Sequence, residues 1–309
     1  MREITHAFGP DGDLIGTLTL PQGTPSRMGL VLFNSGVVHR VGPHRINVKL
    51  ARRLAEHGVA SIRFDLHGMG DSARADGARA YDAQVVCDLQ DAMSLLEQHA
   101  GTQGFVLLGF CSGAQQSYLA AEKDNRVDTI VLYDAFAFHT MRSRLRFLWL
   151  RMRSQGSGAT ALASYARKGV TALAGLPASI AARLRSSSAA DPRAGGHPID
   201  KAAFARGLRV LTQKGVTVIV VHAGDDFSQV NYARQIRDAF GHAWPSHGAT
   251  TVFLEFVDHI ATSTPAQRSF MDALGSIVLN ATNAKVPHQP VTPACMTLNR
   301  AARLSSEDD

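Results

Sequence analysis

The sequence predicts an α/β protein built around one mostly parallel β-sheet with helices on both faces. Short apolar runs alternate with segments of helical spacing along much of the 309 residues. This alternation is typical of repeated strand–helix–strand units, whose strands pair in parallel. Hydrophobic residues make up 45% of the chain, which is enough to bury a large core.

The predicted elements follow in chain order. Segments 3–8 and 14–20 are short apolar strands and predict an antiparallel opening of the sheet. Continuous apolar runs at 30–33, 61–65, 105–110 and 127–133 predict buried strands. Helical spacing predicts helices at 46–57, where Gly58 supplies the C-terminal cap, and at 83–98 and 112–122.

The alternation stops after Asp134 and resumes near residue 216. We expect residues 136–207 to form a basic helical cap inserted into a core of residues 1–135 and 208–283. The alternative is a helical decoration that covers apolar sheet surface. The resumed pattern predicts strands at 216–221 and 251–257, helices at 229–240 and 265–279, and a loose tail at 284–309.

The net charge of +6 is concentrated in one part of the chain. Residues 136–214 hold 14 of the 32 Lys and Arg residues and only two acids, Asp191 and Asp200, which gives +12 there and −6 elsewhere. No recognised nucleic-acid-binding module accompanies this charge, so we expect no nucleic-acid partner. A basic cap would suit an acidic or phosphopantetheine-linked acyl substrate.

The segment around Cys111 carries the strongest chemical signal. The predicted strand at 105–110 leads into Gly109-Phe110-Cys111-Ser112-Gly113, and a helical pattern follows. A side chain on a sharp strand-to-helix turn needs small neighbours, which Gly109 and Gly113 provide. The helix N-terminus favours a thiolate on Cys111. The pattern predicts a nucleophile elbow with a thiol in place of the usual serine hydroxyl.

A thiol nucleophile needs a base and a carboxylate that orients the base. His259 follows the last predicted strand, and Asp225 and Asp226 follow the strand at 216–221. Nucleophile, acid and histidine then occur in the order of one hydrolase arrangement, all at carboxyl ends of strands. The same residues could be a turn, a helix cap and an ordinary histidine.

An oxyanion hole is expected next to Cys111. One donor is the backbone N–H of Ser112, the residue after the nucleophile. The second is expected from the loop 34–38 after the strand at 30–33, from the Val37 N–H, with Gly36 allowing close approach. The glycine could also serve only as a turn between strand and helix.

Several segments together resemble the α/β-hydrolase superfamily. They are Asn34-Ser35-Gly36 with His39-Arg40-Val41-Gly42-Pro43-His44-Arg45, then 63–72 (Arg-Phe-Asp-Leu-His-Gly-Met-Gly-Asp-Ser), 109–114, Ala223-Gly224-Asp225-Asp226 and Asp258-His259. More narrowly they are similar to exosortase A system-associated hydrolases of bacterial exopolysaccharide loci. The resemblance spans residues 13–280 and implies an α/β-hydrolase fold with Asp226 at the acid position. Cysteine instead of serine, and the lack of His-Gly at the oxyanion loop, depart from the commonest members.

Two groups of basic residues have alternative interpretations. Arg40 and Arg45 could bind a substrate carboxylate or phosphate, or hold their loop through salt bridges to Asp65 or Asp71. The run 142–153 contains five arginines. In a helix, Arg142, Arg146 and Arg153 would share one face and Arg144 and Arg151 would lie opposite, so the charge is not confined to one face. Peripheral membrane contact through this basic cap is one possibility that the sequence leaves open.

The sequence thus predicts an ester or thioester hydrolase that acts through Cys111, His259 and Asp226. Acyl transfer to an alcohol or amine, and a catalytically silent binding protein, are the alternatives. The expected substrate is a small-molecule or carrier-linked acyl group, and no metal or cofactor is implied. Cys87, Cys111 and Cys295 show no paired spacing, which argues against a disulfide framework or a zinc site. The first residues lack the apolar core of a signal peptide, so a cytoplasmic location is expected.

Overall fold

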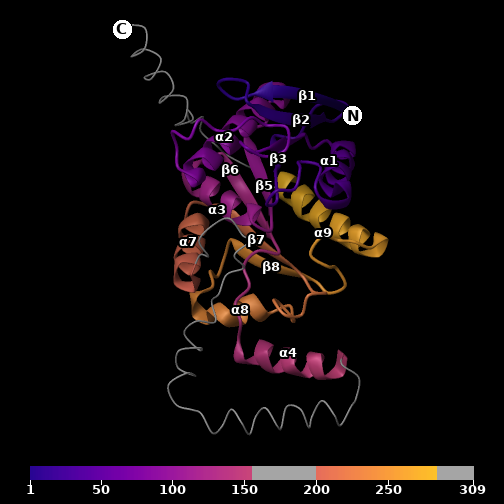
Figure 1. Cartoon of the computed structure of the whole chain (residues 1–309), viewed down its shortest axis with the longest axis vertical. Helices are drawn as coiled ribbons and strands as arrows, with labels where there is room; N and C mark the ends of the chain where they lie inside the picture. The colour runs from indigo at the N-terminus through magenta and orange to yellow at the C-terminus, as the bar shows by residue number, and fades with distance from the viewer. Residues whose placement is uncertain (155–199, 284–309) are drawn as a thin grey trace.

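The centre of the molecule is a twisted, eight-stranded sheet (Figure 1). The computed structural model describes residues 1–154 and 200–283 of the chain. Within that part the strand order is β1-β2-β4-β3-β5-β6-β7-β8, with antiparallel pairing of β1 with β2 and of β2 with β4, and parallel pairing throughout the rest. The strands are β1 (Arg2–Phe8), β2 (Leu14–Leu20), β3 (Met28–Leu32), β4 (Ser61–Asp65), β5 (Gly104–Phe110), β6 (Val127–Tyr133), β7 (Thr217–Ala223) and β8 (Ala249–Leu254).

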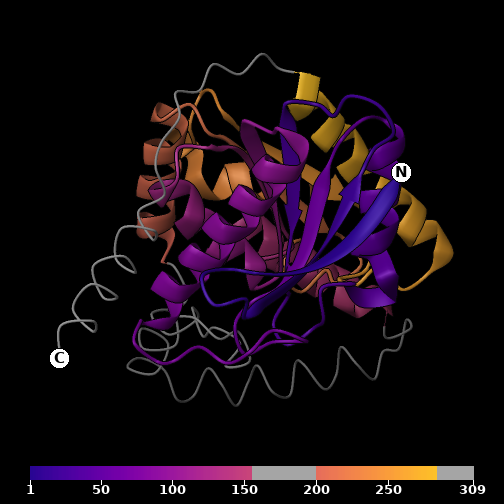
Figure 2. The same ribbon diagram turned by 90° about the horizontal axis from the view of Figure 1, so that it is seen from above.

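Helices cover both faces of this sheet, and Figure 2 shows the sheet between the two groups. One face is covered by α2 (Tyr81–Ala100), α3 (Gly113–Lys123), α7 (Lys201–Gln213) and α8 (Gln235–Phe240), and the other by α1 (Ile46–Glu56) and α9 (Thr264–Asn283). The remaining described helices are α4 (Met141–Ser154) and the short η1 (Pro43–Arg45) and η2 (Gly241–Ala243). The predicted α/β class, the antiparallel opening and the parallel remainder are confirmed.

The packing of α9 shows how the sequence specifies these layers. Phe270, Leu274 and Val278 recur every four residues and are buried on one side of the helix. They join a core cluster with the apolar face of α1 and the apolar side chains of the sheet. Each face of the central strands thus meets an apolar helix stripe, and this explains why these strands are apolar along their whole length.

Two expected elements differ in extent. The helix predicted at 229–240 is shortened to α8, because the buried Gln235 side chain fixes a loop before it. The Gln235 amide accepts a hydrogen bond from the Asn231 N–H (3.0 Å) and donates to the Gln229 (2.8 Å) and Phe138 (3.2 Å) carbonyls. The strand predicted at 251–257 lies at 249–254, and a turn follows it.

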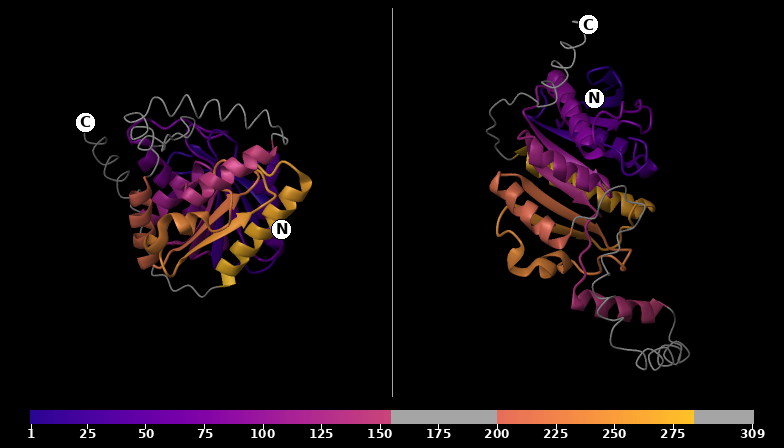
Figure 3. Two further views of the ribbon diagram at one scale, coloured as in Figure 1. Left: turned by 90° about the horizontal axis from the view of Figure 1, so that it is seen from below. Right: turned by 60° about the vertical axis from the view of Figure 1, so that its left-hand side comes forward.

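The expected cap region is described only at its two ends. α4 stands away from the sheet and its helical layers (Figures 1 and 3). By contrast α7, which includes residues 201–207 of the expected insertion, packs on the sheet through buried Phe204, Leu208 and Leu211. Residues 155–199 of the insertion and the tail at 284–309 lie outside the described residues.

The described residues also show the length and polarity of the helices and the state of Cys111. Among the described helices, none is long and apolar enough to cross a bilayer. Among the described cysteines, Cys111 carries a free thiol.

Candidate active site

Cys111 lies on the sharp turn between β5 and α3 that the sequence predicted. Its backbone has φ 53°, a left-handed conformation that costs a residue with a Cβ free energy. The Cys111 N–H donates to the Tyr133 carbonyl at 2.8 Å, which ties the turn to the end of β6. The thiol is partly exposed at the carboxyl edge of the sheet, where a substrate can reach it.

Gly109 is required by the tightness of this turn. A Cβ built at Gly109 would lie 2.3 Å from the Gly113 carbonyl oxygen and 2.5 Å from the Ala114 Cα, both backbone atoms. Gly113 has less strict requirements, since a Cβ there would lie 3.1 Å from the Asn34 carbonyl oxygen. The start of α3 therefore packs directly on the end of β5, as the glycine spacing predicted.

His259 lies beside both Cys111 and a carboxylate. Its Nδ1 donates a 2.6 Å hydrogen bond to Oδ2 of Asp134, at the end of β6. Hydrogen bonds to Asp134 and to Cys111 raise the pKa of His259 to about 10, against a lowering by burial. At neutral pH the imidazole is therefore protonated, and its Nδ1 is occupied by Asp134.

Asp134 is held in place by several contacts. Its backbone has φ 50°, its N–H donates to the Val221 carbonyl at 2.7 Å, and its Oδ1 accepts from the Ala223 N–H at 3.3 Å. Burial raises the pKa of this carboxyl, but the neighbouring His222 and His259 together outweigh burial and lower the pKa from 3.8 to about 2. Asp134 is thus ionised across the physiological range.

The carboxylate beside His259 is not the predicted Asp226. Asp226 is exposed, and its Oδ1 accepts a 3.0 Å hydrogen bond from the N–H of Ser228 two residues on. Asp225 is also exposed, and its backbone N–H donates to the Val257 carbonyl. These residues therefore form a turn after β7, which was the alternative interpretation, and Asp134 takes the position beside the imidazole.

The sequence contained a signal for Asp134. It is the first polar residue after the apolar strand β6, and β6 is the direct neighbour of β5 in the sheet. The rule that led to Asp225 and Asp226 applies equally to Asp134, one strand closer to Cys111. Chain order cannot distinguish the two positions, because both lie between Cys111 and His259.

A second histidine lies against Asp134. His222 on β7 is 3% exposed, and its Nδ1 lies 3.7 Å from Asp134 Oδ1, beyond normal hydrogen-bond distance. Its Nε2 is buried without a hydrogen-bond partner among the described residues. Asp134 therefore has an imidazole near each carboxylate oxygen, and the sequence did not indicate His222.

The expected oxyanion loop lies next to the elbow. The Gly36 N–H donates a 2.7 Å hydrogen bond to the Ser112 hydroxyl, which joins the loop after β3 to the start of α3. Gly36 has φ 55°, and the Val37 side chain is 89% exposed. The buried Asn34 amide holds the loop by donating to the Val38 carbonyl (2.7 Å) and to Asp65 (2.8 Å). The backbones of Val37 and Ser112 are thereby brought to the same edge as Cys111.

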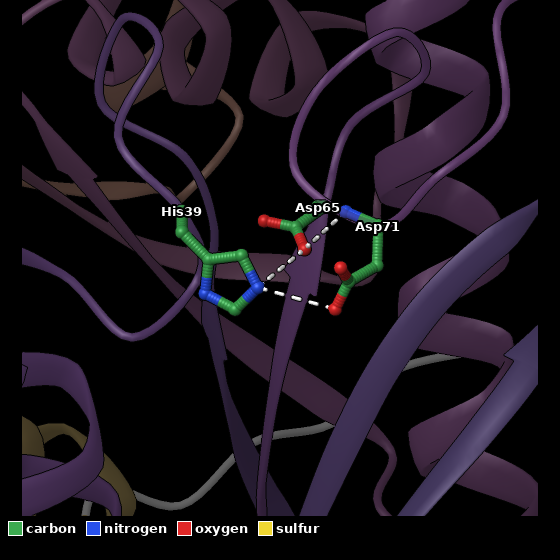
Figure 4. Close-up of side chains that lie close together, drawn as sticks. All are labelled: His39, Asp65 and Asp71. Atoms are coloured by element: carbon green, nitrogen blue, oxygen red, sulfur yellow. Dashed lines mark hydrogen bonds and ion pairs between the residues drawn. The ribbon is translucent and has the colours of Figure 1, made fainter.

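Arg40 holds a neighbouring loop cluster together. Its Nη1 donates to Asp65 Oδ2, to Asp71 Oδ2 (2.7 Å) and to His39 Nε2 (2.8 Å). His39, Asp65 and Asp71 converge as a metal site would require (Figure 4), but the Arg40 guanidinium already supplies their positive charge. Arg40 thus has the loop-holding contacts that the sequence left as an alternative, and the Arg45 side chain is exposed.

The chain is similar to known proteins in both sequence and fold. A model of the alpha/beta hydrolase family matches residues 35–269. No curated protein sequence matches the chain significantly.

Solved structures share the fold at low identity. An esterase from Pyrococcus furiosus has a TM-score of 0.54 at 13% identity, covering 90% of this chain and 90% of that chain. A lidless α/β serine hydrolase from Xanthomonas campestris has a TM-score of 0.51 at 15% identity, covering 92% and 96%. Proline iminopeptidase from Mycobacterium smegmatis has a TM-score of 0.51 at 16% identity, covering 91% and 99%. With an elbow after β5, a histidine after β8 and a family match over most of its length, the chain belongs to the alpha/beta hydrolase family.

Proposed function

We propose that this protein hydrolyses an ester or thioester through a Cys111–His259–Asp134 triad. The observation that carries the proposal is the 2.6 Å hydrogen bond from His259 to Asp134, made by an imidazole that also interacts with Cys111. A nucleophile, a base that it contacts and a carboxylate that orients the base are the components of covalent acyl transfer.

The proposed reaction begins with a protonated His259. Its positive charge stabilises negative charge on Cys111 Sγ, which attacks the substrate carbonyl carbon and forms a C–S bond. The backbone N–H groups of Val37 and Ser112 would hold the resulting oxyanion. The tetrahedral intermediate then collapses, the bond to the leaving oxygen or sulfur breaks, and His259 Nε2 gives that atom its proton.

Deacylation uses the same imidazole as a base. Once Cys111 is acylated, its contribution to the raised pKa of His259 is lost and that of Asp134 remains. The neutral imidazole then accepts a proton from water, whose oxygen attacks the acyl carbon. The C–S bond breaks, its electron pair stays on the sulfur of Cys111 beside the imidazolium, and the acid leaves. Asp134 stays ionised throughout, because its pKa is near 2, and stabilises each imidazolium that forms.

The narrower assignment of substrate rests on sequence resemblance. The motifs at 34–45, 63–72 and 109–114 resemble exosortase A system-associated hydrolases. We therefore favour an acylated substrate connected with exopolysaccharide production, presented as a small molecule or on a carrier.

Kinetics of matched variants test the proposal. On short aryl esters and acyl thioesters, Cys111→Ala should reduce kcat/KM on the order of 10⁴-fold or more, and Asp134→Asn by about 10²- to 10⁴-fold. Asp226→Asn is the control and should stay within about twofold, because its carboxylate caps its own turn. Unchanged activity in Cys111→Ala would reject the nucleophile. Loss in Asp226→Asn alone would reject Asp134.

A further inference from the structure

We propose that the exposed face of α4 binds the surface of an anionic lipid bilayer. The helix projects from the body of the molecule after β6, on the side of the sheet where the parallel strands end (Figures 1 and 3). The proposal does not depend on the proposed function, because it concerns a surface and not the triad.

One side of α4 is docked on the protein. Ser143 is buried, and its carbonyl accepts a 2.9 Å hydrogen bond from the Asn231 side chain. The Phe147 ring lies 5.9 Å from the Phe227 ring, in the loop after β7. These contacts fix which side of the helix faces solvent.

The opposite side is apolar and exposed. Met141, Leu145, Leu148 and Trp149 are 71%, 64%, 50% and 49% exposed. At about 100° per residue these four positions fall within an arc of about 100°, so they form one continuous stripe. A stripe of large apolar side chains in water is unfavourable unless a partner covers it.

The charges around this stripe select an anionic partner. α4 contains five arginines and no acid. Arg142, Arg146 and Arg153 flank one side of the stripe, and Arg144 and Arg151 flank the other. The two groups of arginines therefore border the apolar stripe on both of its sides. This is the arrangement of a helix that lies in a bilayer surface, with apolar side chains inserted and guanidinium groups at the phosphates.

Other exposed apolar side chains lie at the same edge of the sheet. Val37 and Val38 follow β3, and Phe256 and Ile260 follow β8. Cys111 follows β5 at that edge. A bilayer contacted by α4 would therefore face the side of the molecule that carries the triad, and acyl chains in the membrane would lie near it.

Vesicle binding by the full chain tests this surface. We expect binding to vesicles of phosphatidylcholine with phosphatidylglycerol and little binding to phosphatidylcholine alone. The Leu145→Glu/Leu148→Glu variant should lose binding by at least about tenfold, because the two carboxylates would enter the apolar region. Arg144→Gln/Arg146→Gln should weaken binding about 25-fold, at about fivefold for each arginine.

Exposed positions on α7 provide matched controls. Val210 is exposed, as is Arg209, so Val210→Glu introduces a carboxylate at an apolar position outside α4 and Arg209→Gln removes a guanidinium there. Both should bind as the unmodified protein does, and so should Cys111→Ala. Vesicles should also shift Trp149 emission to the blue, and Trp149→Phe should remove this shift.

Three results would overturn the proposal. One is no binding to the anionic vesicles, and another is binding that the α4 variants leave unchanged. The third is self-association in solution that Leu145→Glu/Leu148→Glu abolishes, which would assign the stripe to a second copy of the chain.

Discussion

We expect the ion pair between Asp134 and His259 to stabilise the fold over a defined pH range. Burial raises the pKa of Asp134, but two imidazoles lower it to about 2 from 3.8, and hydrogen bonds to Asp134 and Cys111 raise that of His259 to about 10 from 6.5. The Asp134 contribution is complete above pH 3.8 and is lost as the pH falls toward 2. The His259 contribution is complete below pH 6.5 and is lost as the pH rises toward 10.

We therefore expect Asp134→Asn to lower the unfolding temperature most between pH 3.8 and 6.5. The difference from the unmodified protein should shrink on both sides of that range. Thermal unfolding followed by circular dichroism across pH 2 to 10 measures it, with Asp226→Asn as the exposed control. A difference that is constant with pH would show that charge in this pair does not contribute to stability.

At the residue scale, sequence patterns identified two of the three proposed triad members. Cys111 was predictable because its glycines and strand–helix context are local, and His259 because it directly follows the last strand. The partner of His259 depends on how loops after β6 and β7 approach the last loop, which no local pattern encodes. Asp134 follows β6 as Asp225 and Asp226 follow β7, so strand ends and chain order alone do not distinguish these positions.

The turn between β5 and α3 depends on the missing side chain of Gly109. A Cβ there would lie 2.3 Å from a backbone oxygen, so Gly109→Ala should destabilise the protein by about 3 kcal/mol or more, since no flexible group can move away. Gly275 in α9 is the control: the nearest atom to its Cβ would be Arg53 Nε at 3.8 Å. Gly275→Ala should be neutral or stabilise by about 1 kcal/mol. Chemical denaturation compares the two, and equal effects would contradict this account of the turn.

The loop 34–38, which we expect to supply an oxyanion donor, is joined to the elbow through the Ser112 side chain. Ser112→Ala removes the 2.7 Å hydrogen bond that the Gly36 N–H donates to the hydroxyl, and it should lower kcat by about tenfold because the loop is held less firmly. Ser228→Ala, in the exposed turn after β7, should leave kcat unchanged. A loss on the order of 10⁴-fold in Ser112→Ala would instead indicate that the Ser112 hydroxyl is the nucleophile.

Element boundaries were predictable where apolar periodicity alone determines them. β4 and β6 match their predicted ranges, and α1 and α9 differ by a few residues at their ends. The helix predicted at 229–240 forms only at 235–240, because hydrogen bonds of the buried Gln235 side chain stabilise a loop that the periodicity does not reveal. The same limit applies to α4, whose outward face is defined by contacts with the loop after β7.

For the whole molecule, the parallel sheet explains why distant residues meet. β3, β5, β6 and β8 all end at one edge, so the loops that follow them bring together Val37, Cys111, Asp134 and His259. The alternation of strands and helices was sufficient to predict this edge from sequence. The concentration of positive charge after residue 136 was also visible, but its arrangement around an apolar stripe required the position of α4.

Covalent labelling of Cys111 tests the central claim most directly. The protein is incubated with activated esters and acyl thioesters, and intact mass and peptide mapping locate any acyl adduct. We predict one acyl group per chain on Cys111, absent in Cys111→Ala and slower to clear in Asp134→Asn. An adduct on another residue would contradict the proposed mechanism. So would ester turnover that continues unchanged in Cys111→Ala.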